Sequence, residues 1–537
     1  MTAVWLGTVL LADGLLLLSL GLPLSPVVGI ALAVGVGGLL LSWTPVRAEI
    51  KHTLAAISWL RLLAFLGWAV LIAIYMTQQV TWFDTGLYHF GAVRWLSEFG
   101  AVPGLALLQN NLGFTSSWFA LTAPVNPEAL APRVSAVTNG FVLLIATWQG
   151  GIALGRWLTG HARITDKFMG VFSALVLPAM MLTTFLSAIL VSSSPDIPVI
   201  FLTGIVAWSL LVVANSPQVS DRPTATLWDA SLIPLILAVG TVSIKLSALP
   251  LLPITLLFYW GQQPLNPRRG VVGVMMATLL LLPLMAVSVV TSGCPFYPSS
   301  ALCLDMPWRL PAEQASDAVE IIRGWDRWFG EMPPEANPVL WRFWQWLRLA
   351  RLNLVMLLLL VISTLSMGLT FRVARKQGVL ATPWLFGLSF AGMLFILLRA
   401  PLIRFGLGYF VMIPSVAIAL LGPHYMATLK WQPVQRLTNL VSARRVSQAA
   451  LVGLGIVGAI NLIQPEIQAR LLLPPAMPTA EVEVRQSYDV EYVAPSTDRP
   501  QCWDTPIPCT PNEVSLRLRN PDRGLKAGFI PAPETPE

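Results

Sequence analysis

Residues 352–371 read LNLVMLLLLVISTLSMGLTF, a run without a single charged side chain. An α-helix rises about 1.5 Å per residue, so a run of this length crosses a hydrocarbon core about 30 Å thick. Arg372, Arg375 and Lys376 follow the run directly. Basic loops mark the cytoplasmic side of a membrane. The stretch therefore predicts a transmembrane helix that ends in the cytoplasm.

Comparable apolar runs recur along most of the chain. We expect about thirteen spans, since each run is long enough to cross the bilayer as a helix. They lie near 3–21, 24–43, 62–78, 135–154, 168–191, 198–214, 228–244, 247–261, 271–291, 352–371, 380–398, 406–422 and 447–463. The predicted fold class is an all-α polytopic membrane protein. Because the first run lacks a basic leading segment and a second run follows it, we interpret both as retained spans and not as a signal peptide.

The composition excludes a soluble protein. Hydrophobic residues make up 55% of the 537 positions and charged residues only 11%, whereas soluble domains carry about a quarter. The net charge of +7 is distributed in short clusters between apolar runs and forms no basic stripe. We therefore expect no nucleic-acid partner.

The basic clusters predict the orientation of the spans. All of them fall on one side if the span count is right, and that side is cytoplasmic. The clusters are Arg47, Lys51, His52 and Arg61; Arg156, Arg163 and Lys167; Arg268 and Arg269; Arg372, Arg375 and Lys376; and Lys430, Arg436, Arg444 and Arg445. The N-terminus is then inside, the C-terminus outside, and the protein is a multi-pass protein of the cytoplasmic membrane.

This orientation divides the chain into three parts. Residues 1–61 form an N-terminal hairpin with a basic cytoplasmic loop. Residues 62–463 form the main transmembrane module, with outside loops at 79–134 and 292–351. Residues 464–537 form a Pro-rich outside tail, which we expect to be extended and not a large independent domain.

The cysteines agree with this orientation. Cys294 and Cys303 fall in the second outside loop, and Cys502 and Cys509 fall in the tail. Disulfides persist in oxidising compartments. Three pairings are possible for four cysteines, and pairing within each short segment is the simplest. A zinc site is the alternative, but these spacings match no familiar zinc motif.

Two carboxylates stand where the chain leaves the membrane on the outside. Asp84 precedes an apolar periodicity from 87 to 99 that is typical of an amphipathic surface helix. It is either a helix cap or a functional carboxylate. Asp196 lies in the next outside turn, where it is either an ordinary turn residue or a second functional acid. Paired carboxylates suit base catalysis, metal binding or the binding of sugar hydroxyls.

Three cations lie at outside turns. Lys245 interrupts an apolar stretch, where a charged side chain is costly unless it has a partner or a task; the alternative is a lysine that snorkels to the surface. Arg399 and Arg404 stand against the positive-inside tendency and suit an anionic ligand, since arginine binds phosphate through two parallel hydrogen bonds. Asp13, inside the first span, shows no partner in the sequence and stays unexplained.

Several of these segments resemble the GT-C-type multipass membrane glycosyltransferases. The resemblance covers about residues 62–422. It rests on Phe83-Asp84-Thr85-Gly86-Leu87-Tyr88-His89, on Ser194-Pro195-Asp196, on Lys245-Leu246-Ser247-Ala248-Leu249, and on Arg404-Phe405 leading to Pro414. Many members carry a second acid where this chain has Thr85, which puts metal dependence and catalysis in question.

A narrower similarity is to a bacterial multipass membrane family, and it implies no substrate. It rests on Gly86-Leu87-Tyr88-His89, Val102-Pro103-Gly104-Leu105, Leu112-Gly113-Phe114, Ser116-Ser117-Trp118-Phe119, Gln501-Cys502-Trp503-Asp504 and Pro508-Cys509-Thr510-Pro511.

The GT-C resemblance implies transfer of a sugar from a polyprenyl-phosphate donor to a glycan or lipid acceptor on the outer face of the membrane. Asp84 would be the base, assisted by Asp196, and these two would hold a divalent cation if one is needed. Lys245, Arg399 and Arg404 would bind the lipid phosphate. Tyr88 and His89 would line the sugar pocket or anchor the surface helix at the interface.

Two alternatives remain open. One is a transporter or flippase of an anionic lipid or saccharide, which requires polar residues deep in several spans. The other is a polysaccharide polymerase or ligase, which predicts catalytic His or Arg in the loop 292–351. That loop has arginines but no histidine. The chain also has no Walker loop, HExxH, GxSxG or dinucleotide fingerprint.

Overall fold

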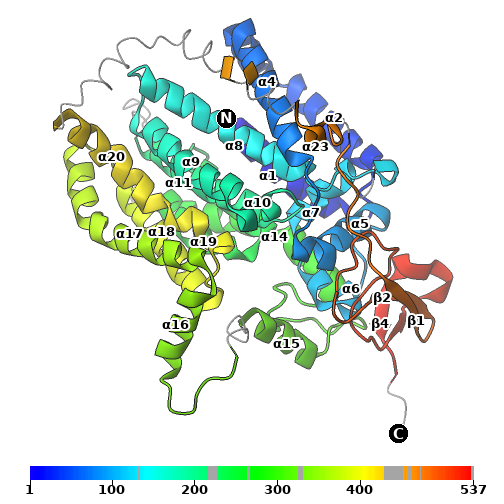
Figure 1. Cartoon of the computed structure of the whole chain (residues 1–537). Coiled ribbons are helices and arrows are strands. Elements are labelled where there is room, and N and C mark those ends of the chain that lie inside the picture. Colours follow the sequence, from blue (N-terminus) through cyan, green and yellow to red (C-terminus); the bar gives the residue numbers. More distant parts are fainter. Residues whose placement is uncertain are drawn as a thin grey trace.

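The computed structural model describes residues 1–130, 133–215, 227–262, 266–323, 330–428, 452–453, 455–456, 463–471 and 473–533. The described chain is mostly helical. Figure 1 shows the helices as a bundle, with α15 (Ala312–Arg323), α16 (Pro338–Leu349) and all four strands at its lower end.

The remaining elements follow in chain order. The helices of the first part are α1 (Thr2–Leu18), α2 (Pro26–Ser42), α3 (Thr44–Ala56), α4 (Trp59–Met76), the π-helix η1 (Thr85–His89), α5 (Phe90–Glu98), α6 (Leu105–Leu108), η2 (Asn110–Gly113), α7 (Ser117–Thr122), η3 (Ala123–Val125), η4 (Glu128–Leu130), α8 (Val137–Leu158), α9 (Ile164–Leu182), α10 (Thr184–Leu190) and α11 (Asp196–Ala214). Those of the second part are α12 (Leu232–Ile244), η5 (Leu246–Ala248), α13 (Leu251–Gly261), α14 (Pro267–Ser292), α17 (Arg351–Lys376), α18 (Thr382–Arg399), α19 (Ile403–Phe410), α20 (Met412–Thr428), α23 (Pro465–Gln468) and η7 (Pro521–Ala527).

Eight helical segments among the described residues are long and apolar enough to cross a membrane. They are α4, α8, α9, α11, α14, α17, α18 and the continuous segment Ile403–Gly422. Three other expected spans are the shorter apolar helices α1, α12 and α13. The run 24–43 is α2, which continues into α3 across a bend of 98°. The last expected span, 447–463, lies almost entirely outside the described residues. The described part of the chain is thus mostly helical, as expected for a polytopic protein, with eight candidate spans, or nine if the bent pair is one span.

Helix α11 is the centre of the bundle. It contacts α8, α9, α12, α18 and α19, and its side chains are buried almost without interruption from Asp196 to Leu211. A helix that is apolar on every side is stable only where other helices surround it. Its first residue, Asp196, is therefore enclosed by protein and not exposed at a turn.

The tail contains more regular structure than expected. Strands β1 (Val482–Ser487) and β2 (Val490–Pro495) form one antiparallel pair, and β3 (Leu516–Leu518) and β4 (Phe529–Pro531) form another. The backbone N–H of Phe529 donates to the carbonyl of Pro103, 2.9 Å away. The tail therefore packs against the segment 79–134. The Cys294–Cys303 and Cys502–Cys509 disulfides are both present, so each short segment closes on itself.

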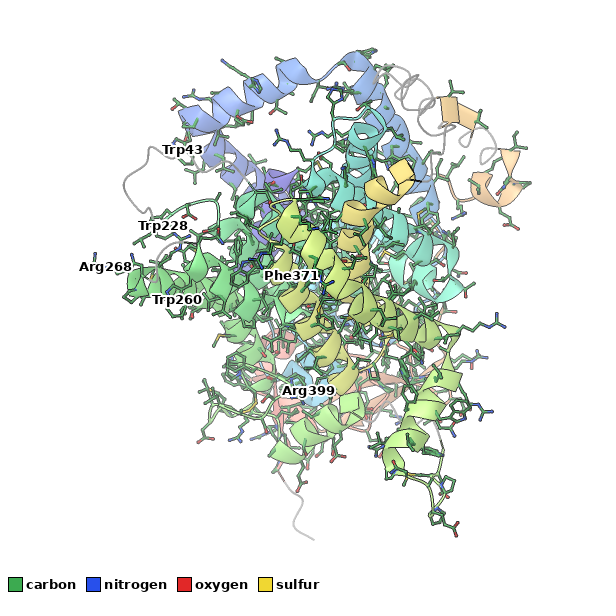
Figure 2. All side chains as sticks on the ribbon, turned by 90° about the vertical axis from the view of Figure 1, so that its left-hand side faces the viewer. Trp43, Trp228, Trp260, Arg268, Phe371 and Arg399 are labelled. Atoms are coloured by element: carbon green, nitrogen blue, oxygen red, sulfur yellow. A yellow bond between two sulfur atoms is a disulfide. The ribbon has the colours of Figure 1, made fainter. Side chains whose placement is uncertain are left out.

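A buried arginine explains why the run 228–244 is helical only from Leu232. Arg269 is fully buried and binds Asp229 with two hydrogen bonds of 2.8 and 3.1 Å. Its Nε donates to the Tyr259 carbonyl at 2.6 Å, and its Nη2 donates to Ser231. Residues 228–231 turn to make these contacts, which join the adjacent ends of α12, α13 and α14. Neighbouring Arg268 is exposed and lies at the outer edge of the bundle in Figure 2.

We predict that Arg269→Met lowers the free energy of unfolding by about 3–5 kcal/mol, because it leaves the Asp229 carboxylate without its partner. Arg268→Met is the matched control and should change stability by less than about 0.5 kcal/mol, since it is a surface substitution. Denaturant unfolding of the two variants in detergent checks this prediction. Equal stability of the two variants would contradict the role assigned to Arg269.

Candidate functional site

Four predicted site residues lie at the ends of four helical elements, on the same end of the bundle. Asp84 directly precedes η1, and Asp196 begins α11. Lys245 ends α12 in an extended conformation. Arg404 is the second residue of α19. Each is therefore placed where an apolar helix meets a polar loop.

These side chains form one continuous chain of charges. Arg404 Nη1 donates to Asp84 Oδ2 at 2.6 Å, although the two residues are 320 positions apart. Arg404 Nε lies 3.9 Å from Asp196 Oδ2. The other oxygen of Asp196 accepts a hydrogen bond from Lys245 Nζ. The structure thus brings together the four residues that the sequence singled out from separate segments.

The contacts show how three of these side chains are held. The Asp84 side chain makes no helix-capping hydrogen bond and turns to Arg404 instead. Lys245 does not extend freely to the surface, because it pairs with Asp196. The carboxylate of Asp196 lies within reach of two cations and is not merely part of a turn.

Burial makes this arrangement energetically demanding. The Asp196 side chain is 1% exposed, whereas Asp84, Arg404 and Lys245 are 22%, 15% and 25% exposed. A buried charge is tolerated only when it is paired and hydrogen-bonded. Two carboxylates and two cations balance one another here. Asp196 forms the closed side of the cluster, and Asp84 and Lys245 face the more open side.

Aromatic rings flank the two cations. Lys245 Nζ lies 4.4 Å from the centroid of the Phe405 ring. The Arg404 guanidinium carbon lies 4.6 Å from that centroid and 5.1 Å from the Trp82 ring. A ring face attracts a cation and keeps water from it. The rings therefore hold the cations without neutralising them.

Several buried polar atoms near this cluster have no hydrogen-bond partner within the described chain. They are Trp82 Nε1, His89 Nε2, Ser193 Oγ, Ser247 Oγ and Arg404 Nε. Buried polar groups in folded proteins are normally satisfied, so each exception requires an explanation. These atoms belong to Arg404 itself and to segments that carry the four charged residues, so they are available to a polar ligand.

His89 and Tyr88 are held inside the protein near the cluster. His89 is 1% exposed, and its Nδ1 lies 3.4 Å from the Thr85 hydroxyl. The Tyr88 ring packs edge-on against it at 4.4 Å, and the Phe119 ring lies at 5.3 Å. Burial, with a further contribution from the charge of Lys245, lowers the pKa of His89 well below its ordinary value. His89 is therefore enclosed by protein, in surroundings that disfavour its charged form.

Arg399 does not join the cluster, contrary to our expectation. It is the last residue of α18, it is exposed, and Figure 2 shows it at the lower end of the bundle. It makes no ion pair with the described part of the chain. The turn from Ala400 to Leu402 separates it from Arg404, and Pro401 is fixed there by a 2.8 Å hydrogen bond from Trp346. Arg399 thus faces away from the bundle, whereas Arg404 faces Asp84 and Asp196.

The carboxylates do not fit a divalent cation as they are placed. Asp84 and Asp196 flank the Arg404 guanidinium, which already lies where a shared metal ion would bind. Among the described residues no group of three or more His, Cys, Asp or Glu side chains comes together. We therefore derive no chemistry through a metal.

Asp13, which had no visible partner in the sequence, has one in the structure. Its carboxylate accepts a 2.5 Å hydrogen bond from the Ser243 hydroxyl on α12. The sequence reasoning assigned no role to Trp82, Ser193, Ser247 and Phe405. Each lies within three residues of a predicted charge, and Ser247 and Phe405 also stand in the segments that resemble the GT-C enzymes.

We predict that acid destabilises the protein through His89. Its folded-state pKa lies below the ordinary 6.5, so below pH 6.5 only the unfolded chain gains the proton. Stability should fall by about 1.4 kcal/mol for each pH unit from 6.5 down to the lowered pKa. His89→Gln should reduce this pH dependence, whereas the exposed control His161→Gln should keep it. Thermal unfolding between pH 5 and 8 checks the prediction, and parallel curves for all three proteins would contradict it.

The comparisons with known proteins give a family but no function. No curated protein and no solved structure matches the chain. A family model described as a domain of unknown function, DUF8201, matches residues 1–411, well over half of the 537 positions. The matched region includes all four residues of the charged cluster. The chain therefore belongs to the DUF8201 family.

Proposed function

We propose that this protein is a glycosyltransferase that uses a polyprenyl-phosphate-linked sugar and acts on the outer face of the cytoplasmic membrane. The observation that carries the proposal is the charged cluster of Asp84, Arg404, Asp196 and Lys245 at the ends of apolar helices. A lipid-linked phosphate has its charged group at this depth, because its chain lies in the bilayer. The proposed membrane and orientation follow from the distribution of basic loops.

The cluster supplies the two functions that such a transfer needs. Arg404 and Lys245 are the cations that would bind the phosphate, and arginine does so with two parallel hydrogen bonds. Asp84 is the more exposed carboxylate and would face the acceptor. Asp196 would keep both cations in place from the buried side. The unpartnered hydroxyls of Ser193 and Ser247 would contact polar groups of the substrate.

The ion pair between Asp84 and Arg404 suggests how binding prepares catalysis. A phosphate that binds Arg404 competes with Asp84 and releases its carboxylate. Asp84 then accepts the proton of the acceptor hydroxyl, whose oxygen forms a bond to the anomeric carbon of the sugar. The bond from that carbon to the phosphate oxygen breaks, and the phosphate retains the electron pair. Arg404 and Lys245 stabilise the negative charge that develops on it.

The distribution of charge favours this proposal over a transporter or flippase. In the eight candidate spans every Asp, Glu, Lys and Arg lies within five residues of an end of its span. The paired Asp13 on α1 is the buried exception outside these spans. A path for an anionic substrate is normally lined by charged groups deep in several spans. The described spans carry their charged residues near their ends instead, and the cluster of Asp84, Arg404, Asp196 and Lys245 lies at one of these ends, as expected for a site at the membrane surface.

We predict that Asp84→Ala lowers the rate of sugar transfer by about 10²–10⁴, the range expected for loss of a positioned base. The assay uses protein in nanodiscs and a set of polyprenyl-phosphate sugars, with release of free polyprenyl phosphate measured by mass spectrometry. Chelators should not abolish transfer, because Arg404 lies where a shared metal ion would bind. A well-folded Asp84→Ala protein with full activity would rule out this mechanism.

A second prediction concerns binding of the lipid phosphate. Arg404→Gln should weaken the binding of a polyprenyl phosphate at least about tenfold, since a charge-assisted hydrogen bond contributes about 1.5–3 kcal/mol. Arg399→Gln is the matched control and should leave binding unchanged, because Arg399 is exposed and outside the cluster. Titration of both variants with decaprenyl phosphate in detergent measures this. Equal binding by both variants would contradict the assignment of Arg404.

A further inference from the structure

A tryptophan from the C-terminal tail lies directly on the π-helix that follows Asp84. The backbone N–H of Trp503 donates to the carbonyl of Gly86, 3.0 Å away. A Cβ atom added at Gly86 would lie 2.5 Å from the Trp503 ring, so only glycine allows this contact. The indole is 9% exposed and packs in a buried cluster with Val80, Phe90 and Met477.

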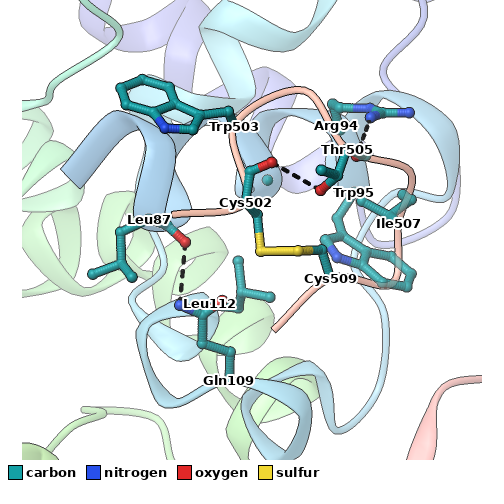
Figure 3. Close-up of a pocket in the computed structure, with 11 residues that line it drawn as sticks. Leu87, Arg94, Trp95, Gln109, Leu112, Cys502, Trp503, Thr505, Ile507 and Cys509 are labelled. Carbon is teal, nitrogen blue, oxygen red and sulfur yellow. Dashed lines mark hydrogen bonds between the residues drawn. A yellow bond between two sulfur atoms is a disulfide. The ribbon is translucent and has the colours of Figure 1, made fainter. Parts of the chain in front are cut away.

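The segment that presents Trp503 is closed and fixed at several points. The Cys502–Cys509 disulfide joins its ends, and Thr505 donates a backbone and a side-chain hydrogen bond to the Cys502 carbonyl. Arg94 of α5 donates to the Thr505 carbonyl at 2.7 Å. Figure 3 shows this closed loop against Leu87 of η1 and Arg94 of α5.

The backbone of Trp503 is itself constrained. Its φ of +46° lies in the left-handed region, which non-glycine residues rarely occupy. Such a conformation persists only when the surroundings hold it, and it is common at functional sites. The disulfide-closed loop provides these surroundings, because it prevents the chain on either side of Trp503 from relaxing.

We infer that the loop Cys502–Cys509 positions the candidate site. Trp503 of this loop fixes the backbone at Gly86, and the fixed backbone holds Asp84 beside Arg404. The inference rests on the proposed function only in treating Asp84 as the carboxylate of the site. Gly86 is two residues from Asp84, and π-turns of this kind are irregular segments that are often found at functional sites. Trp503 would act through the backbone and is not a catalytic residue.

A single introduced thiol can report the place of position 84. All four cysteines of the chain are paired, so Asp84→Cys supplies the only free thiol. A nearby guanidinium lowers the pKa of a thiol, and the pH dependence of its reaction with a maleimide measures that pKa. The midpoint for Asp84→Cys should lie about one pH unit below that for Asp84→Cys with Arg404→Gln.

Adding Trp503→Ala to Asp84→Cys should raise the midpoint by about the same one unit, because the thiol moves away from Arg404. Trp503→Phe should preserve the lower midpoint, since an aromatic ring still packs on Gly86. Asp504→Asn, which removes the 3.9 Å ion pair of this loop with Arg94 but leaves Trp503 in place, is the control and should also preserve it. A merely structural role would change the fraction of folded protein and not this midpoint.

The inference fails if Trp503→Ala leaves the midpoint at the value measured with native Trp503. The test does not depend on whether the Trp503→Ala protein folds, because two other variants disturb the same contact. Gly86→Ala should displace the indole, and replacement of both Cys502 and Cys509 by serine should open the loop, so each is expected to raise the midpoint. The assay contains no lipid or sugar, so the positioning role and glycosyl transfer can fail independently.

Discussion

The placement of Arg404 between Asp84 and Asp196 is the interaction on which the rest of the site depends. Without it Asp84 would have no cationic partner, because the other cation of the cluster, Lys245, pairs with Asp196. Removing one partner of such a buried group typically costs several kcal/mol. The helices that carry these residues must therefore end at the same level and face one another. That requirement agrees with the end of α12 at Lys245, which has an extended conformation.

Much of the site could be predicted from sequence, because a charge at the end of a long apolar run is conspicuous. Asp84, Asp196, Lys245 and Arg404 were all identified in this way. Their pairing could not be predicted, since it depends on which helices become neighbours across 320 positions. Arg399 shows that sequence also fails to predict which of two nearby arginines joins the cluster. It lies five residues before Arg404 in the same kind of segment, and only the packing of Pro401 against Trp346 determines which arginine faces inward.

The fold was predictable to a similar degree and for a similar reason. Apolar runs identified most helices, and among the described residues eight segments are long and apolar enough to cross a membrane. The run 228–244 was too long by several residues because Asp229 turns to pair with the buried Arg269, a contact made by residues 40 positions apart. The tail was the largest departure from expectation. Its composition suggested an extended segment, but its strands and its disulfide loop pack against the segment that carries Asp84, which no local sequence pattern reveals.

The central claim is that the charged cluster is the binding site for a lipid phosphate. The most direct measurement is photocrosslinking in nanodiscs with a polyprenyl phosphate that carries a diazirine next to the phosphate, followed by peptide mass spectrometry. We expect labelling of Trp82 or Phe405, whose rings lie 4.4–5.1 Å from the Arg404 and Lys245 cations, and loss of that labelling in Arg404→Gln. Labelling confined to other segments, or unchanged labelling in Arg404→Gln, would contradict it.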